Sequence, residues 1–384
     1  MNYQMQFYEG YARLPDKYEA LLAVAAEQGL YYRREWFESL MEYYYIRGQR
    51  LRLYTVEDAQ TGQPLLMMPL YLTRTDTAAR GAYTLAAVSH YENYTPMCMV
   101  LDPDASNQRR ELLTALFTWM GNAGDNESRT SVDVLRLAPF VTDSELGNDA
   151  LEAIKNAGFA AQIYSNSYNQ YEEVAGLSYA DYLAGRSSNQ RYNSRRRRRN
   201  LEKKGKLEFS MITGDSDPVE LRDAIDDYIL VAVHSWKSRE STISKFILHW
   251  MQVAAKLGYL RLGILRLDGK AIAAQFWIYS GGVGSLTRTN FREDFRDVAP
   301  GVVLSNMVIE YLLDVEHATA LDLGYGDENY KGRWVQDARV YSGIMGYNPG
   351  TPRGFYTGHK NILGQPLKRM LKRGRLALQV RGAV

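Results

Sequence analysis

Residues 300–326 read PGVVLSNMVIEYLLDVEHATALDLGYG, and they predict an α-helix that is followed directly by a β-strand. Pro300 suits the first position of a helix, where a backbone N–H is not needed. Apolar residues then recur at helical spacing as far as the end of the predicted helix, and residues 319–326 read as the strand. This helix and strand close a longer series of elements.

The elements before residue 300 complete an order of strand, two helices, three strands, helix and strand. Two of the strands form a hairpin across Asp268 and Gly269. The predicted elements are a strand at 206–213, helices at 218–236 and 243–258, and strands at 259–269, 270–282 and 284–291.

The first half of the chain repeats this order, with one more strand before its third helix and a further helix and strand at its end. Its predicted elements are a strand at 5–10, helices at 15–28 and 33–46, strands at 50–58, 64–74, 82–90 and 94–102, a helix at 107–121, a strand at 131–140, a helix at 146–158 and a strand at 160–166. A repeat of this size indicates the duplication of a whole domain. Residues 178–205 are charged and poor in apolar residues, and they predict a helical bridge that is broken near Gly185.

The composition predicts a globular protein, with the cytoplasm as the expected compartment. The 384 residues are 46% hydrophobic, and Lys plus Arg outnumber Asp plus Glu by only 46 to 44. A dedicated nucleic-acid binder would be more basic, so we expect no DNA partner. Cys98 is the single cysteine, and neither a signal peptide nor a membrane span is recognisable. Because the five histidines are scattered and no HExxH, CxxC, GxSxG or Walker pattern occurs, we expect no metal site.

Four pieces of the second half carry a resemblance to a known family. They are RYNSRRRRRNLEKKGK at 191–206, HSW at 234–236, APGVVLSNMVIEYL at 299–312 and LDLGYGDENYKGRW at 321–334. Together with the order of elements, these pieces resemble the GNAT acyltransferase superfamily, and within it the CelD-like acetyltransferases of cellulose and exopolysaccharide biosynthesis. That branch is related to the Fem-type aminoacyl transferases, which carry two tandem GNAT-like domains.

The resemblance implies an α/β fold of two tandem GNAT-like domains, each a mixed, mostly antiparallel sheet flanked by helices. We expect an N-terminal domain at 1–177, an arginine-rich helical connector at 178–205, and an acyltransferase domain with a basic tail at 206–384.

The resemblance also implies a site for acyl-CoA in RDVAPGVVLSN, which begins at Arg296. In many GNAT enzymes a Gln/Arg-x-x-Gly-x-Gly/Ala loop opens the central helix, and its N–H groups hold the pyrophosphate of coenzyme A. Arg296, Gly301, Val302 and Val303 are the equivalent donor-binding residues. The proline of this loop supplies no N–H, and Val303 replaces a small residue. A working acyl-CoA site and a helix start kept for structure therefore remain alternatives, and an acyl carrier protein or a charged tRNA also fits as donor.

The stretch LGYGDENYK at 323–331 is the predicted catalytic segment. Amide formation needs a base for the amine proton, a polarised thioester carbonyl and a proton for the leaving thiolate. Asp327 or Glu328 is the candidate base. Tyr330 is the candidate proton donor, and Lys331 is a candidate for binding an anion or stabilising charge. A strand-terminating turn with a surface acidic cluster is the competing interpretation.

Other polar residues are candidates for substrate binding. His234 and Trp236 end a helix, with Trp236 as a candidate wall of the acceptor pocket. Arg288 and Asn290 lie on a central strand, where they face either a cleft or solvent. Tyr94 lies where the central strands of the first half are expected to splay.

The arginine run is predicted to be a connector helix with one face toward the cleft. Five consecutive arginines cannot share one face, because successive helical residues turn by about 100°. We expect Arg195 to face the cleft and bind a phosphate or carboxylate, and we expect replacement of Arg197 to have little effect.

The sequence therefore predicts an acyltransferase that moves an acyl group from acyl-CoA, or a related thioester, to an amine of a sugar, polysaccharide precursor or amino-acid-like acceptor. Two alternatives are Fem-like transfer from charged tRNA and a non-catalytic GNAT-fold module of an exopolysaccharide system. The basic stretch at 366–382 indicates either peripheral contact with the inner membrane or a solvated terminal helix.

Overall fold

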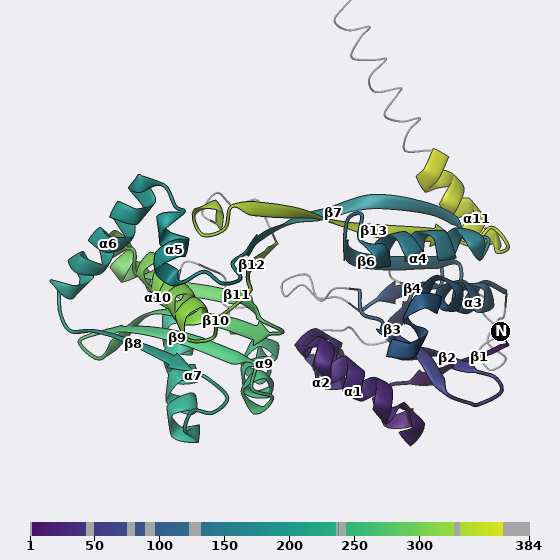
Figure 1. Cartoon of the computed structure of the whole chain (residues 1–384), viewed down its shortest axis with the longest axis horizontal. Coiled ribbons are helices and arrows are strands. Elements are labelled where there is room, and N and C mark those ends of the chain that lie inside the picture. The colour runs from purple at the N-terminus through teal and green to yellow at the C-terminus, as the bar shows by residue number, and fades with distance from the viewer. Residues whose placement is uncertain are drawn as a thin grey trace, which may run out of the picture.

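The computed structural model describes residues 2–43, 50–74, 81–88, 97–122, 132–235, 237, 243–325 and 331–363. Figure 1 shows two units side by side, each with a sheet and flanking helices. The fold is α/β, as expected. Within the described ranges, no helix is long and apolar enough to cross a membrane.

The first unit follows the predicted order of elements. Its helices and strands are β1 (Tyr3–Glu9), α1 (Glu19–Gln28), α2 (Arg34–Tyr43), β2 (Arg50–Asp58), β3 (Pro64–Thr73), β4 (Thr84–Ala87), β5 (Val100–Leu101), α3 (Arg109–Asn122), β6 (Val134–Val141), α4 (Glu145–Asn156) and β7 (Ala160–Glu173). Short 3-10 helices occupy Tyr11–Arg13, Asp16–Tyr18, Leu30–Tyr32 and Pro103–Gln108. β2 and β3 form an antiparallel pair.

The second unit repeats the order. Its helices and strands are β8 (Leu207–Ile212), α7 (Pro218–Val233), α9 (Lys245–Lys256), β9 (Leu260–Leu267), β10 (Lys270–Ser280), β11 (Val283–Phe291), η5 (Glu293–Val298), α10 (Pro300–Asp314), β12 (Ala320–Tyr325) and η6 (Lys331–Arg333). The helix that begins at Pro300 and the strand after it are confirmed.

The segment predicted as a connector is helical and broken near Gly185, and it lies on the second unit (Figure 1). It consists of α5 (Tyr179–Ala184) and α6 (Ser188–Glu202), which flank Gly185. Ser178 caps α5 and Ser187 caps α6, because each side chain accepts a hydrogen bond from a backbone N–H of the first turn. The arginine run lies in α6, at the end of the second unit that is distant from the first (Figure 1).

The last described strand returns to the first unit. β13 (Asp337–Tyr347) pairs with β6 and β7, and α11 (Pro352–Gly358) and η7 (His359–Leu363) follow it. Within the described residues, one 13-stranded sheet runs β1-β2-β3-β4-β6-β13-β7-β12-β11-β10-β9-β8, with β5 beside β3. β7 and β13 cross from one unit to the other (Figure 1). The expected domain boundaries stay predictions, and the basic tail lies outside the described residues.

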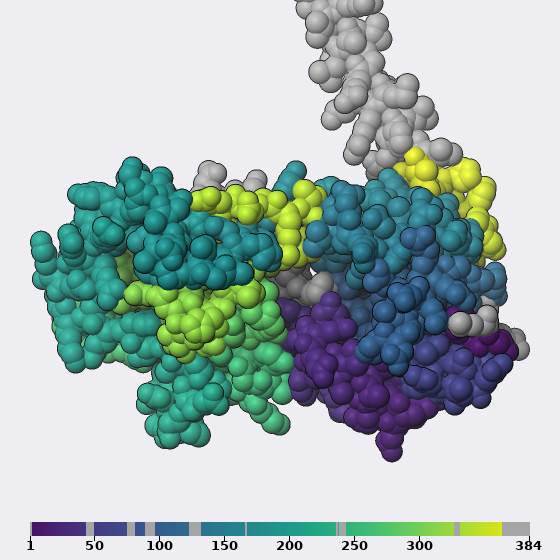
Figure 2. Space-filling view, viewed as in Figure 1, coloured from purple at the N-terminus to yellow at the C-terminus, as the bar shows by residue number. Residues whose placement is uncertain are grey.

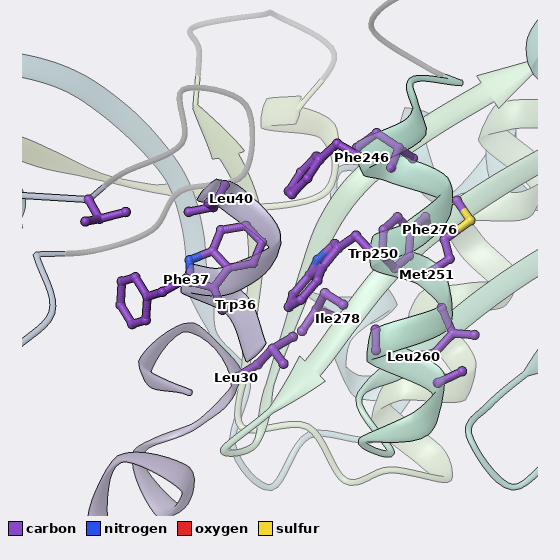
Figure 3. Close-up of a cluster of buried hydrophobic side chains, with 14 of the residues drawn as sticks. Leu30, Trp36, Phe37, Leu40, Phe246, Trp250, Met251, Leu260, Phe276 and Ile278 are labelled. Atoms are coloured by element: carbon purple, nitrogen blue, oxygen red, sulfur yellow. The ribbon is translucent and has the colours of Figure 1, made fainter. Parts of the chain in front are cut away.

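The two units share a hydrophobic core. Trp36 of α2 and Trp250 of α9 are fully buried, and their ring centroids lie 4.4 Å apart. Figure 3 shows Leu40 of α2 on one side of this contact and Phe246 of α9 on the other. In Figure 2 the purple surface of the first unit meets the green surface of the second unit without a gap. The units therefore have a fixed arrangement, which positions the site described next.

Candidate functional site

β11 and β12 are parallel neighbours that separate part of the way along their length. Within the described residues they pair over Val283–Ser285 and Ala320–Asp322. The register between β10 and β11 shifts after Phe276, which indicates a β-bulge. Gly324 in β12 has a φ of 73°, a left-handed conformation that glycine adopts without steric cost. An opening therefore lies between the two strands beyond their paired residues.

A cavity of about 330 Å³ lies against this opening, and we call it the α10 cavity. Its apolar lining residues are Trp277, Leu286, Phe291, Val302, Ile309, Leu323 and Trp334. The amide of Gln275 donates to Ser305 Oγ at 2.7 Å and to Thr289 Oγ1 at 3.1 Å. Its Oε1 accepts a hydrogen bond of 3.0 Å from the indole of Trp277. These bonds satisfy a buried amide and fix the tryptophan that lines the cavity.

The N-terminus of α10 reaches the α10 cavity. Gly301 and Val302 of the first turn both line it. Ala299, the residue before the helix, has a φ of 50°, and no side chain of the described residues caps this end. Pro300 has no N–H, and the N–H groups of Val302 and Val303 donate to the carbonyl oxygen of Ala299 at 3.0 and 3.4 Å. The helix dipole still favours an anion at such a position. Val303, the fourth expected donor-binding residue, is buried and lines a separate hollow beside α5 and α6.

Cationic side chains also line the α10 cavity: Arg197, Lys237, Arg296 and Arg333. Arg296 pairs with Glu293 at 2.8 Å, and the ammonium of Lys237 donates to the carbonyl oxygen of Thr289 at 2.8 Å. The cavity thus combines an apolar wall with positive charge near a helix N-terminus.

A second cavity of about 190 Å³, the inter-unit cavity, lies between residues 28–32 of the first unit and strands β10 to β13. Asp322 is its acidic residue. The carboxylate of Asp322 accepts hydrogen bonds of 2.7 Å from Asn169 Nδ2 and from Gly324 N. Arg339 pairs with the same carboxylate at 3.0 Å and donates to Asn169 Oδ1 at 2.7 Å. The network is closed, so it holds the carboxylate in one orientation.

Tyrosines complete the wall of the inter-unit cavity. Burial, and then the negative charge of Asp322, raises the pKa of both Tyr31 and Tyr341 above the ordinary value. Both phenols therefore stay neutral at physiological pH and keep a proton to donate. Ser280 Oγ accepts a hydrogen bond of 3.2 Å from Leu30 N, which fastens the first unit to β10 at this place.

Leu286 lines both cavities. Leu323 lines the α10 cavity, whereas Asp322 and Gly324 line the inter-unit cavity, because successive residues of a strand point to opposite faces. The opening between β11 and β12 thus lies between an apolar, cationic cavity and a polar one. This arrangement can bring the ends of two different ligands together.

Part of the predicted catalytic segment lies outside the described residues. This holds for Asp327, Glu328 and Tyr330, and it also holds for the substrate-binding candidates Trp236 and Tyr94. Lys331 is described and buried, and its ammonium donates a hydrogen bond to the carbonyl oxygen of Tyr325. This bond joins the two ends of the segment that carries the candidate base.

The remaining candidates lie apart from the lining of both cavities. His234 is exposed, and its Nδ1 lies 2.8 Å from the carbonyl oxygen of Leu230 in its own helix. Arg288 is half-buried and donates to the carbonyl oxygen of Thr287 at 2.7 Å. Asn290 is 1% exposed, and its amide has no partner among the described residues. Their binding roles stay predictions. The described residues contain no group of three His, Cys, Asp or Glu side chains suited to a metal ion.

Arg197, and not Arg195, lines the α10 cavity. Arg195 is exposed and lines the hollow beside α5 and α6 that Val303 also lines. The sequence pattern had predicted the reverse. The rotation of α6 is set by Ser194 and Leu201, which are 8% and 0% exposed, and Arg197 lies between them at helical spacing. This pair of small and apolar residues was the sequence signal that could have predicted which side of α6 faces inward. Ligand binding by Arg195 stays a prediction.

Several residues of the two cavities were not anticipated from the sequence: Gln275, Trp277, Ser305, Asp322, Arg333 and Arg339. Gln275 carries a visible signal, because it is the polar residue within the apolar strand KAIAAQFWIYS. The others come from separate elements, and no local pattern connects them.

The corresponding opening of the first unit is filled by the chain itself. β4 and β6 pair in parallel over Thr84–Ala86 and Val134–Arg136, as β11 and β12 do in the second unit. Met97 and Met99 follow β4 and are buried in the hydrophobic cluster of this unit. Met97 N donates to the carbonyl oxygen of Pro139 at 2.7 Å. The candidate site therefore belongs to the second unit.

Comparisons with known proteins match part of the second unit to a family and most of the chain to solved folds. Residues 188–332, less than half of the chain, match the family described as an acetyltransferase (GNAT) domain. A crystal structure of FemX is 12% identical with a TM-score of 0.55, and the match covers 96% of this chain and 99% of FemX. A conserved protein of unknown function from Bacteroides thetaiotaomicron VPI-5482 is 11% identical with a TM-score of 0.51, over 90% of this chain and 100% of that one.

A tandem GNAT protein from the clavulanic acid biosynthesis pathway is 12% identical with a TM-score of 0.47, over 89% of this chain and 98% of that protein. No curated protein matches the sequence. At these identities, the likeness to FemX and to the Bacteroides protein shows a common fold alone. The CelD-like branch stays a prediction.

Proposed function

We propose that this chain is an N-acyltransferase that transfers an acyl group from acyl-CoA in the α10 cavity to an amine in the inter-unit cavity. The observation that carries this proposal is the position of Leu286 between two cavities of different character. The match of residues 188–332 to a GNAT acetyltransferase domain supports it, because this range contains every lining residue of the α10 cavity except Arg333 and Trp334.

The α10 cavity fits the chemistry of an acyl-CoA donor. Coenzyme A has a narrow pantetheine arm that ends in the thioester, and its other end carries phosphates. The apolar wall suits the arm and the acyl group, and the first turn of α10 suits a phosphate. Gly301 and Val302 lie at that turn. Arg296 lies in the preceding η5 helix, at the position that the resemblance implies for a donor-binding residue.

The reaction forms a C–N bond and breaks a C–S bond. The amine nitrogen attacks the thioester carbonyl carbon, the sulfur leaves as a thiolate, and the amine loses a proton while the thiolate gains one. Asp327 or Glu328 is proposed as the base and Tyr330 as the proton donor, on the strength of the sequence. Lys331 then acts by positioning this segment, since its ammonium is bonded to the carbonyl oxygen of Tyr325.

The inter-unit cavity suits a polar acceptor. Its volume of about 190 Å³ matches a single sugar ring or an amino-acid side chain. Tyr31 and Tyr341 offer hydroxyl groups and aromatic faces, and Arg339 offers a cation. The proposed acceptor is therefore an amine on a sugar, a polysaccharide precursor or an amino-acid-like molecule.

A charged tRNA is the second candidate donor, and the exposed face of α6 favours it. Arg195, Arg196, Arg199 and Lys203 line one shallow surface of this helix. Such a basic surface suits a nucleic-acid backbone, and binding through it would weaken steeply as salt is raised.

Calorimetric titration with acetyl-CoA tests the proposal. Val302→Trp places a large ring in the α10 cavity, and Met307→Trp is the matched control, because Met307 is also half-buried on α10 but does not line the cavity. The wild-type chain and the control are expected to bind acetyl-CoA, whereas Val302→Trp should lose at least tenfold in affinity. Binding of charged tRNA without binding of acetyl-CoA would favour the second candidate, and binding of neither would refute both.

A further inference from the structure

Arg197 of α6 and Arg333 of η6 line the α10 cavity, and neither forms an ion pair with a carboxylate of the described residues. Burial, and then the charges of Arg333 and Arg196, lowers the pKa of Arg197 from its ordinary value. Two positive groups are thus held near each other beside an apolar wall, an arrangement that costs free energy until an anion arrives.

Hydrogen bonds from side chains to backbone carbonyl oxygens, and not an ion pair, hold together the segments that carry these two arginines. The side-chain amide of Gln190 in α6 donates to the carbonyl oxygen of Arg333, and the hydroxyl of Tyr182 in α5 donates to the carbonyl oxygen of Trp334. Gln336 Nε2 adds a hydrogen bond of 3.2 Å to the carbonyl oxygen of Gly185. The chain around η6 is therefore fastened to α5 and α6.

Neighbouring arginines have other roles. Arg186 is buried and pairs with Glu172 at 2.6 Å, and Arg198 pairs with Glu202 at 3.1 Å. Arg199 is exposed, so water solvates its charge. Within the described part of α6, Arg197 alone combines partial burial, a place in the α10 cavity and the lack of a carboxylate partner.

We infer that Arg197 and Arg333 form a clamp for a phosphate group of the acyl donor. A guanidinium presents several N–H groups in a planar fork that matches two phosphate oxygens, and a phosphate between the two side chains cancels their repulsion. The inference rests on the proposed function and deepens it. In this inference the connector helix α6 is part of the donor site. The enzyme then prefers a thioester donor that carries phosphate to one that lacks it.

Titration with coenzyme A and with pantetheine, which lacks phosphate, tests the clamp. The variants are Arg197→Gln and Arg333→Gln, with Arg199→Gln as the matched control on α6. Each clamp variant is expected to weaken coenzyme A binding by about tenfold or more, the scale of a charged hydrogen bond. Pantetheine binding should stay within about twofold of wild type. Pantetheine carries no phosphate, so the substitutions remove no contact that this ligand makes. Thermal melting of each variant shows that it is folded.

The outcomes separate the clamp from the proposed function. Unchanged coenzyme A binding in both clamp variants, an equal loss for pantetheine, or an equal loss in Arg199→Gln would overturn the clamp and leave the acyltransferase proposal standing. Binding of neither probe by the wild-type chain would overturn both. Repeating the titration with 4′-phosphopantetheine identifies which phosphate the arginines hold, since only a clamp on that phosphate makes the variants lose affinity for this shorter probe.

Discussion

Asp322 and Leu323 are adjacent residues of β12 that line different cavities, Asp322 the inter-unit cavity and Leu323 the α10 cavity. One peptide unit thus separates a polar site from an apolar site. β11 does not pair with β12 beyond Ser285 in the described residues, so no row of strand hydrogen bonds lies between the two sites there. In the proposed reaction, the amine and the thioester meet at this opening.

Asp322→Asn should affect the acceptor side and spare the donor side. The change removes the charge that pairs with Arg339, and the unfolding free energy should fall by about 1–3 kcal/mol. Coenzyme A affinity should remain within about twofold of wild type. Urea unfolding and calorimetry check both values. Glu152→Gln, which breaks an exposed pair with Lys155, is the control and should cost less than about 1 kcal/mol. A loss of donor binding in Asp322→Asn would show that the two cavities are not separate.

Gly301→Ala should separate stability from donor binding. An added Cβ would meet Phe291 Cδ1 at 3.4 Å, an ordinary contact, so the melting temperature should not fall. The same methyl group narrows the approach to the first turn of α10, and acetyl-CoA affinity should drop by roughly fivefold. Unchanged affinity together with an unchanged melting temperature would mean that no donor group approaches Gly301.

Trp250→Ala should destabilise both units together. Trp250 and Trp36 belong to a hydrophobic cluster drawn from both units, and truncation of a buried tryptophan costs about 3–5 kcal/mol. Urea unfolding should show one transition at a lower midpoint by both fluorescence and circular dichroism. Tyr356→Ala, at an exposed position of α11, is the control. A second transition at the wild-type midpoint would indicate that the units fold independently.

Glu57→Gln should reduce the loss of stability in acid. Burial acts to raise the pKa of Glu57, but hydrogen bonds from Lys17 and Tyr18 outweigh it and hold this pKa below its ordinary value. A carboxyl group with a lowered pKa stabilises the fold above its unfolded pKa, and this contribution is lost as the pH falls through the folded pKa. The unfolding free energy of the variant should therefore fall less than that of wild type between about pH 5 and pH 3. Equal losses in both proteins would contradict this account of Glu57.

The order of elements was predictable because each helix and strand carries its own periodicity and its own boundary signal. Pro300 marks the start of α10, and Gly185 marks the break between α5 and α6. β13 was not predicted. Its partners β6 and β7 lie far away in the sequence, and only the assembled sheet shows that a strand after the second unit completes the first.

The candidate site was predictable only where one segment carries it. Arg296, Gly301 and Val302 of the predicted donor loop line the α10 cavity, and the start of a helix is a local feature of the sequence. Their role in donor binding stays a prediction. The choice between Arg195 and Arg197 depends on which side of α6 packs inward, and that side is set by contacts with other elements. The neighbours of Asp322 and Arg333 come from segments that lie far apart in the sequence, so only the complete fold brings them together.

A crystal structure of the chain with bound coenzyme A tests the central claim most directly. The account predicts the sulfur at the opening between β11 and β12, beside Leu286, with a phosphate between Arg197 and Arg333. Coenzyme A bound at the first unit, or on a surface away from the α10 cavity, would contradict it.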